Sequence, residues 1–379
     1  MTLEKINIKN VPLVQLAEDF KTLGLEGYRA RQIRQWLFQK DAAAFSDMTN
    51  VGKAFREILE ARYTIERLPV LIQQTSTDGT IKFLIKLHDG ETIEAVWIPA
   101  KERRTLCLST QVGCGMACDF CLTGEMGLKR NLTLFEIIEQ VAAVKRLLPE
   151  GERITNLVFM GMGEPLANAK NLYSALETLL DPEAFNFSRQ HVTVSTSGLA
   201  PEIEKFGNKT PVKLAISLNA TTDEVRDVIM PINRKFNLAR LVDACQKMHL
   251  PKRNRVTFEY VMLHGINDTM DDAKRLVKIL SKLKAKINLL PFNEYPGSPY
   301  KRPPEEWIRA FQKYLADRDF IAVVRQSRGR DILGACGQLA TTEKGLVGEA
   351  KDFAITGGPT RKSKAKLDMA GVDLYHEGL

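Results

Sequence analysis

Residues 105–121, TLCLSTQVGCGMACDFC, hold four of the six cysteines in this 379-residue chain. Cys114, Cys118 and Cys121 have the spacing C-x3-C-x2-C and follow a strand-like, alternating segment. Three thiolates on one short loop suit three corners of an iron–sulfur cube, whereas an electron carrier uses four. A zinc site is the alternative, and it needs a fourth ligand from elsewhere in the chain. In a reducing compartment either metal fits such crowding better than a disulfide scaffold does.

Strand-like segments recur downstream of this loop, with helical segments between most of them. Strands are expected near residues 105–110, 154–160, 191–196, 212–219, 255–263 and 286–292, with a further one near 320–326. Helices are expected near residues 133–147, 168–180, 200–206, 238–249, 269–283 and 305–316. Repeated alternation predicts an α/β fold with a parallel sheet and crossover helices. Six such units favour a partial (β/α)6 barrel, whose chemistry lies at the carboxyl ends of its strands.

The chain before residue 100 has a different rhythm. Apolar residues at helical spacing predict helices within 12–62, while IKFLIKL (81–87) and TIEAVWI (92–98) predict two strands joined by an Asp-Gly turn. We therefore expect a small N-terminal α+β accessory domain over 1–99, the barrel over 100–340 and a C-terminal extension over 341–379. The extension contains TGGPTRKSKAK, which is typical of a mobile tail.

Composition narrows the class of protein further. The net charge is +8, and the first 99 residues carry as many acidic as basic side chains, so the excess lies in 100–379. This balance suits a polyanionic partner such as a nucleic acid. Hydrophobic residues make up 44% of the chain, which excludes a mainly disordered protein. No apolar run approaches the ~18 residues of a membrane span and the amino end lacks a secretion signal, so we expect a cytoplasmic protein without membrane contact.

The motifs together resemble one family. C-x3-C-x2-C after a first barrel strand, with an aromatic residue before the last cysteine, resembles the radical S-adenosylmethionine (SAM) superfamily. Over residues 94–340 the chain is similar to the RlmN-type RNA methyltransferases of that superfamily, and the N-terminal module agrees with their accessory RNA-binding domain. The similarity is carried by QVGCGMACDFCLTGEMGLKRNLT, FMGMGEPLAN, VTVSTSGLAP, AISLNA, MPIN, YVMLHGIND and RGRDILGACGQLA.

The resemblance implies a particular chemistry. One 4Fe–4S cluster, with Cys114, Cys118 and Cys121 as ligands, would bind SAM on its open iron, and two SAM molecules would be used per turnover. The implied targets are C2 of adenine-2503 in 23S rRNA and C2 of adenine-37 in tRNA, with an external one-electron reductant such as flavodoxin. The related Cfr enzymes methylate C8 of the same rRNA adenine and carry Ala after the Gly-Glu pair, where this chain has Pro165. The resemblance therefore favours C2.

The resemblance also assigns roles to single residues. Cys336, in the segment GACGQ, would carry the methyl group as S-methylcysteine. Cys107 would release the product through a transient disulfide, and Glu94 would remove the C2 proton. Read alone, these are a small buried thiol, a strand residue and an exposed hairpin carboxylate. The apolar residues around Glu94 nevertheless favour a partly buried setting, in which its pKa would be raised. Cys245 matches no motif and is expected to pack in the core. The residues expected to bind SAM are Gly163, Glu164, Ser195, Ser217, Leu218, Asn219 and Asn293.

The RNA contacts rest on charge alone. The basic residues proposed to contact phosphates are Arg29, Arg31, Arg34, Lys129, Arg130, Arg253 and Arg255, although each could equally be a solvated charge. Because C2 of a stacked adenine is inaccessible, the base must be unstacked or flipped out. Two other classes of protein stay open: a radical SAM enzyme acting on a small molecule, and a non-catalytic RNA-binding protein with a structural metal. Iron and sulfide analysis tests the second of these.

Overall fold

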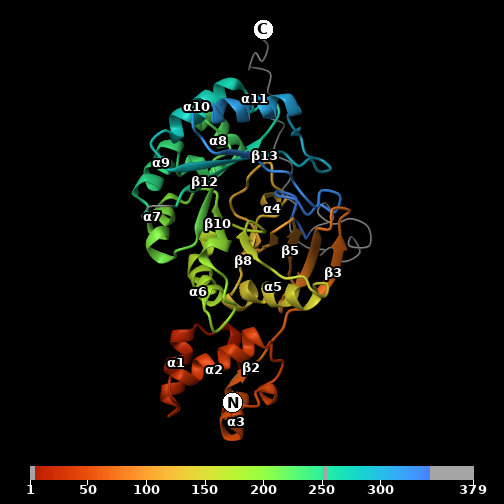
Figure 1. The fold of residues 1–379 in the computed structure, drawn as a ribbon, viewed down its shortest axis with the longest axis vertical. Helices are drawn as coiled ribbons and strands as arrows, with labels where there is room; N and C mark the ends of the chain where they lie inside the picture. Colours follow the sequence, from red (N-terminus) through yellow and green to blue (C-terminus); the bar gives the residue numbers. More distant parts are fainter. Residues whose placement is uncertain (1–4, 251–253, 342–379) are drawn as a thin grey trace.

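The computed structural model describes residues 5–250 and 254–341, and its centre is one ten-stranded sheet (Figure 1). In spatial order the strands are β14 (Ala322–Val324), β13 (Ala285–Pro291), β12 (Val256–Met262), β11 (Lys213–Ser217), β10 (Val192–Thr196), β9 (Asn156–Phe159), β6 (Arg104–Cys107), β5 (Thr92–Pro99), β4 (Ile81–Lys86) and β3 (Val70–Thr75). From β6 to β14 neighbouring strands are parallel, whereas β3, β4 and β5 are antiparallel and extend the sheet beyond β6. The sheet is the expected partial barrel and includes the further strand expected near residues 320–326.

Helices cover the outer, convex side of the sheet (Figure 1). They are α5 (Leu134–Leu147), α6 (Ala169–Leu180), α7 (Ala200–Lys209), α8 (Asp223–Ile229), α9 (Leu238–Lys247), α10 (Met270–Leu280) and α11 (Glu305–Ala316). Short 3-10 turns η4 (Pro165–Asn168), η5 (Arg189–His191) and η6 (Pro231–Arg234) lie between them. A capping box begins α5, where the Thr133 hydroxyl accepts from the Glu136 amide and the Glu136 carboxylate accepts from the Thr133 amide. The crossover helices expected from the sequence are present, with α8 in addition.

Side chains alternate along each barrel strand between a core face and a cavity face. On β12, Tyr260 is buried and stacks on Phe311 of α11 with ring centroids 5.6 Å apart, whereas the adjacent Glu259 lines a cavity. On β13, Ile287 is buried and the adjacent Asn288 lines a cavity. Because successive side chains of a strand point to opposite faces, the core lies between the sheet and the helices and the concave face is polar.

A two-stranded antiparallel ribbon joins the two ends of the cysteine loop. It pairs β7 (Gln111–Gly113) with β8 (Leu128–Asn131), and the short helix α4 (Leu122–Glu125) follows the third cysteine. Gly113 has a φ of 73°, and a Cβ added to it would lie 1.8 Å from the carbonyl oxygen of Gly127. The same oxygen accepts a hydrogen bond from the Cys114 amide at 2.8 Å. Only glycine permits this approach of the two backbones.

Residues 6–64 form a helical lobe at the lower end of Figure 1. In chain order it contains β1 (Ile6–Asn7), η1 (Ile8–Asn10), α1 (Leu13–Thr22), α2 (Tyr28–Arg34), the π-helix η2 (Gln35–Gln39), η3 (Phe45–Asp47), α3 (Lys53–Arg62) and β2 (Tyr63–Thr64). Ion pairs join the lobe to the barrel, among them Lys9 with Glu139 at 2.9 Å, Arg34 with Asp181 at 3.1 Å and Asp41 with Arg146 at 2.9 Å. The strands expected at 81–98 are not part of this lobe, because β5 pairs with β6 and adds the hairpin to the barrel sheet.

The structure leaves some expectations about the chain untested. Residues 342–379, which make up nearly all of the expected C-terminal extension, lie outside the described residues, and so does Arg253. In the described part of the chain, none of the helices combines the length and the apolar character needed to cross a bilayer.

Candidate active site

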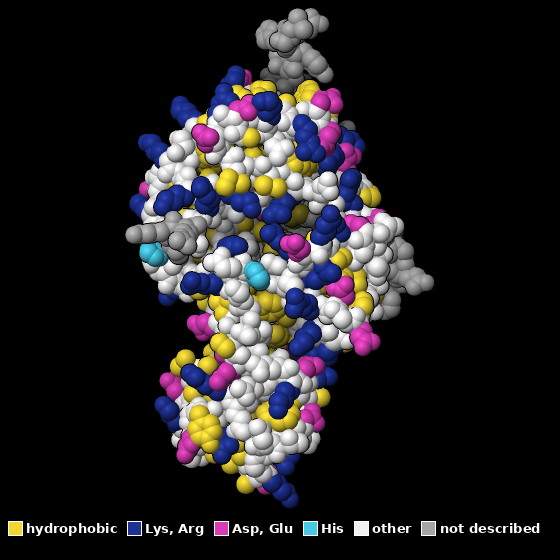
Figure 2. Space-filling model, viewed as in Figure 1, with side chains coloured by type: hydrophobic (Ala, Val, Ile, Leu, Met, Phe, Trp, Pro, Cys, Tyr) yellow, Lys and Arg dark blue, Asp and Glu magenta, His cyan; other side chains and the backbone are white. Residues whose placement is uncertain are grey.

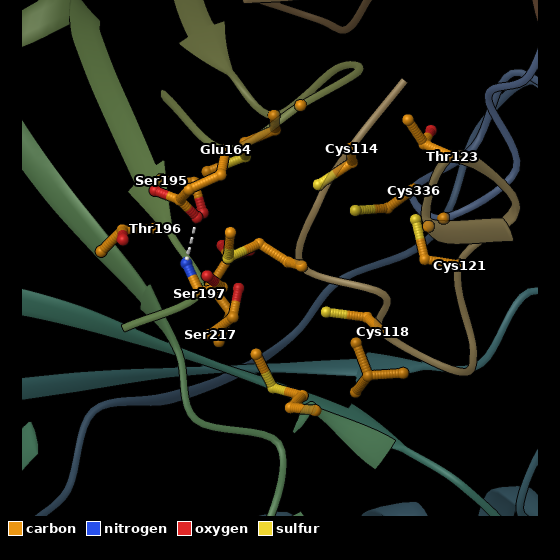
Figure 3. Close-up of a pocket in the computed structure, with 18 of the residues that line it drawn as sticks. Cys114, Cys118, Cys121, Thr123, Glu164, Ser195, Thr196, Ser197, Ser217 and Cys336 are labelled. Carbon is orange, nitrogen blue, oxygen red and sulfur yellow. Dashed lines mark hydrogen bonds between the residues drawn. The ribbon is translucent and has the colours of Figure 1, made fainter. Parts of the chain in front are cut away.

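The three spaced cysteines line one cavity at the carboxyl ends of the barrel strands. Figure 3 shows the thiols of Cys114 and Cys118 directed into the space opposite Glu164. The Cys121 amide donates to the Cys118 carbonyl oxygen at 3.1 Å, so a tight turn sets the relative positions of the last two thiols. Burial raises the pKa of all three thiols, that of Cys114 to about 12. Positive charge from a metal would be needed to keep them ionised at neutral pH.

Glu164 enters the same cavity from the loop after β9. Its Oε1 accepts from the Leu166 amide at 3.0 Å, and its Oε2 accepts from the Ser197 amide at 2.7 Å (Figure 3). Burial raises the pKa of this carboxyl, and the hydrogen bonds oppose the rise. The preceding Gly163 has a φ of 99°, and a Cβ on it would lie 2.5 Å from the Gln111 side chain. The strand ends therefore hold one carboxylate in a set orientation, in which it can bind an ammonium group.

Three of the other residues expected to bind SAM line this cavity: Ser195, Ser217 and Asn219. The side chain of Leu218 does not, because it points to the core face between its two neighbours, where it is fully buried. Asn293 does not line the cavity either. It donates from Nδ2 to the Cys336 carbonyl oxygen at 3.1 Å, so in this structure it positions the Cys336 segment.

Arg226 of α8 was not singled out by the sequence, and it is fully buried behind the cavity. Its guanidinium donates to the carbonyl oxygens of Ser197, Leu218 and Ser217 at 2.8, 2.9 and 3.1 Å, and to Oδ1 of Asn233 at 3.0 Å. Burial lowers its pKa to about 10, whereas the nearby Cys118 thiol raises it. The Arg226 guanidinium thus bridges carbonyl oxygens at the ends of β10 and β11, near the Cys118 thiol. An arginine on an amphipathic helix carries no sequence signal of this role.

The donor set fits the implied cofactors. Three thiols are the soft ligands that an iron–sulfur cluster uses, and Glu164, Ser195 and Ser217 offer oxygen atoms for the polar groups of SAM across the cavity. Within residues 5–250 and 254–341, no three His, Cys, Asp or Glu side chains are grouped as ligands of a single metal ion. The thiols instead lie around a shared space, as the corners of a cluster require.

Cys336 lies on a segment that is bonded to the cysteine loop. The Leu122 amide donates to the Gly337 carbonyl oxygen at 2.9 Å, and the Thr123 hydroxyl donates to that of Leu339 at 2.5 Å. The Cys336 side chain is exposed to the cavity that Cys114, Cys118 and Cys121 also line (Figure 3). Because protein surrounds this cavity, burial raises the pKa of the Cys336 thiol.

Cys336 also lines a second cavity of about 790 Å³ that extends toward the amino ends of the strands. Cys107, the last residue of β6, lines this second cavity as well. Burial raises the pKa of the Cys107 thiol to about 12, and Cys107 in turn raises the pKa of Cys336. The two cysteines paired by the family resemblance therefore face one space. Cys245 is buried on α9, which confirms the expected packing role.

Glu94 lies on β5 and is fully buried, which excludes the exposed hairpin carboxylate and goes further than the partly buried setting that its apolar neighbours indicate. It forms an ion pair with Lys82 at 2.9 Å, and its Oε2 accepts from the Ala340 amide at 2.9 Å. Burial raises its pKa to about 7, although Lys82 and the Ala340 amide oppose the rise. Glu94 lines neither cavity, and it reaches the Cys336 segment through Ala340.

Basic side chains surround the outer opening of the second cavity, here called the cationic mouth: Arg103, Arg153, Lys213, Lys286 and Arg325. Within the part of the chain that the structure describes, none of the five forms an ion pair with a carboxylate. Burial lowers the pKa of Lys286, and repulsion from Arg325, Arg103 and Lys213 lowers it further. Figure 2 shows Lys and Arg side chains around a hollow in this face of the molecule. Uncompensated positive charge around a cavity attracts a polyanion.

Most basic residues proposed from the sequence to bind RNA have other partners. Ion pairs join Arg34 to Asp181, Lys129 to Glu91, and Arg130 to both Asp89 and Glu136. Arg31 lies 3.8 Å from Glu183, and Arg29 stacks on Tyr28. Arg255 is exposed. The sequence analysis did not single out Lys213 and Lys286, the strand residues of the cationic mouth. A lysine at the start of an otherwise apolar strand could have indicated them.

Comparison with known proteins shows which family the chain belongs to. Residues 108–277 match the model of the radical SAM superfamily, and residues 6–65 match that of the ribosomal RNA large subunit methyltransferase N-terminal domain. The chain is 52% identical over 337 residues to a dual-specificity RNA methyltransferase RlmN of Geotalea uraniireducens, which covers 89% of this chain and 97% of that protein. The chain belongs to the RlmN family.

Further relatives agree with this assignment to the RlmN family. The RlmN of Geobacter sulfurreducens is 51% identical over 334 residues, covering 88% of this chain and 92% of that protein. The crystal structure of a radical SAM methyltransferase from Sphaerobacter thermophilus has 40% identity and a TM-score of 0.82, covering 88% of this chain and 99% of that one. Membership makes this chain a SAM-dependent RNA methyltransferase of the radical SAM type and implies a 4Fe–4S cluster.

Proposed function

We propose that the chain methylates C2 of an adenine in RNA through an S-methylated Cys336. One observation carries the proposal: Cys336 lies where the cavity of the three cysteine ligands meets the cavity behind the cationic mouth. A thiol in this position can take a methyl group on one side and pass it to a base on the other. Such a relay is needed because C2 of adenine, an electron-poor carbon between two nitrogens, does not attack a sulfonium methyl group directly.

The cluster side of the site prepares Cys336. Cys114, Cys118 and Cys121 hold the cluster, and Glu164 orients the amino group of SAM. When bound, a first SAM would supply the methyl group, and a second SAM on the cluster would supply a 5′-deoxyadenosyl radical. Cys336 accepts the methyl group on its sulfur, and that methyl group then gives one hydrogen atom to the radical. The methylene carbon on Cys336 joins C2 and links the protein to RNA, and the odd electron of the adduct would pass to the oxidised cluster.

Glu94 and Cys107 complete the reaction. Glu94, with a pKa of about 7, accepts the C2 proton once the Cys336 segment, to which it is bonded through Ala340, brings the base near. Cys107 then attacks the sulfur of Cys336, which gives a disulfide and methylated RNA. Cys107 lines the second cavity, whose volume of about 790 Å³ is large enough for a flipped nucleotide.

The proposed substrates are adenine-2503 of 23S rRNA and adenine-37 of tRNA, in the cytoplasm, with an external one-electron reductant such as flavodoxin. The relatives are named as dual-specificity enzymes, which supports two RNA substrates. We further propose that the N-terminal lobe is the accessory RNA-binding domain. Its residues 6–65 match the family model of the ribosomal RNA large subunit methyltransferase N-terminal domain. The cationic mouth would hold the phosphates on either side of the flipped base.

The test is nucleoside mass spectrometry of rRNA and tRNA fragments after anaerobic reaction with SAM and reductant. Chromatography against both standards should show 2-methyladenosine, and Cys336→Ala should form none. Cys118→Ala should lose the brown absorbance of the cluster as well as the product. A dominant 8-methyladenosine product would place the chain with the Cfr-type enzymes, and product from Cys336→Ala would refute the relay.

A further inference from the structure

Glu259 is a buried carboxylate that the reaction outlined above does not use. It lies on β12, paired in register with Ser217 of β11 and Asn288 of β13. Its side chain is 6% exposed and lines both cavities, as Cys336 does. Asn288 donates from Nδ2 to Oε1 of Glu259 at 3.2 Å. Glu259 therefore faces the space that Cys336, Cys107 and the substrate base share.

The release step needs a proton acceptor beside Cys107. The attacking species is a thiolate, but burial raises the pKa of this thiol to about 12, so little thiolate exists at neutral pH. The Glu259 carboxylate is close enough to raise that pKa further by its negative charge. Glu94 is paired with Lys82, and Glu164 accepts from two backbone amides, whereas Glu259 accepts from the Asn288 side chain. Glu102 also lines the second cavity, but it is exposed.

We propose that Glu259 takes the proton from Cys107 as that sulfur attacks Cys336, and returns it to the methylene carbon that becomes the product methyl group. This inference rests on the proposed function. The Cys107 S–H bond and the bond from Cys336 sulfur to carbon break, while a disulfide and a C–H bond form. The sulfur atoms lose two electrons and the carbon gains them, so the step needs no other oxidant or reductant.

The surroundings of Glu259 suit a group that both takes and gives a proton. Burial raises its pKa, whereas the hydrogen bond from Asn288 and the charges of Arg325 and Lys286 at the cationic mouth lower it. Cys107 and Cys336 line the same second cavity, and the charge of Glu259 raises the pKa of both thiols. A carboxyl whose pKa is raised toward neutrality accepts a proton more readily than an exposed one and still returns it.

The test compares variants of the cluster-loaded protein in a single turnover with labelled RNA. We expect Glu259→Gln to form the covalent protein–RNA adduct and to resolve it about 10²-fold more slowly than the wild type, within the usual range for loss of a general acid–base group. Glu259→Asp should recover part of the rate because it keeps a carboxylate. Asp268→Asn removes a buried carboxylate that lines neither cavity, and it should resolve the adduct at the wild-type rate.

Alkylation of Cys107 by iodoacetamide, without RNA, shows whether Glu259 accepts the thiol proton or only raises the thiol pKa by charge repulsion. Loss of a proton acceptor slows alkylation near neutral pH, whereas loss of a repulsive charge lowers the thiol pKa and speeds it. Faster alkylation in Glu259→Gln, or adduct release at the wild-type rate, overturns the inference. If the wild type forms neither adduct nor methylated RNA, the proposed function fails, while slower alkylation in Glu259→Gln would still support the proton-accepting role.

Discussion

Gly113→Ala should weaken the cysteine loop far more than Gly127→Ala does. The two glycines face each other where the β7–β8 ribbon meets the cysteine loop, and both have left-handed backbones, with φ of 73° and 68°. A Cβ at Gly113 would lie 1.8 Å from the carbonyl oxygen of Gly127, whereas a Cβ at Gly127 would meet nothing within 4 Å. The two variants therefore share the backbone strain and differ in the steric clash.

The structure sets the size of the difference. Alanine in the left-handed region costs roughly 1–2 kcal/mol at either position. At Gly113 the facing carbonyl must also move by more than 1 Å, which breaks its hydrogen bond from the Cys114 amide, worth about 0.5–1.5 kcal/mol, and leaves polar groups unpaired for about 1–3 kcal/mol more. We expect Gly113→Ala to destabilise the ribbon by about 2 kcal/mol or more beyond Gly127→Ala.

Iron and acid-labile sulfide are measured after anaerobic reconstitution, together with the free energy of unfolding in urea. Gly127→Ala should retain a near-normal cluster content, and Gly113→Ala should lose most of it because Cys114 directly follows the disrupted residue. Equal cluster content and equal stability in the two variants would show that the ribbon does not position the cluster ligands.

Three further perturbations test other parts of the site. Arg226→Lys cannot reproduce four hydrogen bonds from a fixed planar group, so the free energy of unfolding should fall by about 2–4 kcal/mol in urea titration. Cys107→Ala should trap a covalent protein–RNA adduct on a denaturing gel, whereas Cys245→Ala should turn over normally; methylated RNA released by Cys107→Ala at the wild-type rate would contradict the resolving role. The rate of product formation should rise with pH through about 7, because Glu94 accepts a proton only when ionised, and Glu94→Gln should abolish that rise.

Local sequence patterns predicted the barrel well because its signals are local. The prediction of the strands and crossover helices rests on the spacing of apolar residues along the chain. The prediction that Cys114, Cys118 and Cys121 share one site rests on their spacing in one loop, and the three do line one cavity. The hairpin at 81–98 was assigned to the accessory domain because its own pattern does not show which edge it pairs with. The pairing partner is β6, and only the assembled sheet shows that β5 lies beside it.

Residues whose role comes from burial could not be recognised along the chain. The role of Arg226 comes from its hydrogen bonds to three carbonyl oxygens at the ends of two strands. The sequence does not show that these strand ends lie together. The apolar neighbours of Glu94 indicate partial burial, but nothing in the hairpin shows that the Cys336 segment covers the carboxylate completely. Glu259 did have a signal, because a carboxylate between Phe258 and Tyr260 interrupts an apolar strand and marks its inward face.

The cavity lined by the three spaced cysteines lies at the carboxyl ends of the strands, and the cationic mouth lies at their amino ends. Under the proposed function, cofactor and RNA would therefore approach Cys336 from opposite ends of the barrel. A spent cofactor would then be exchanged while the RNA stays in place. The two ends would also be free to change separately in evolution, so that substitutions around Lys213 or Lys286 would alter RNA selection without altering the residues around the three cysteines.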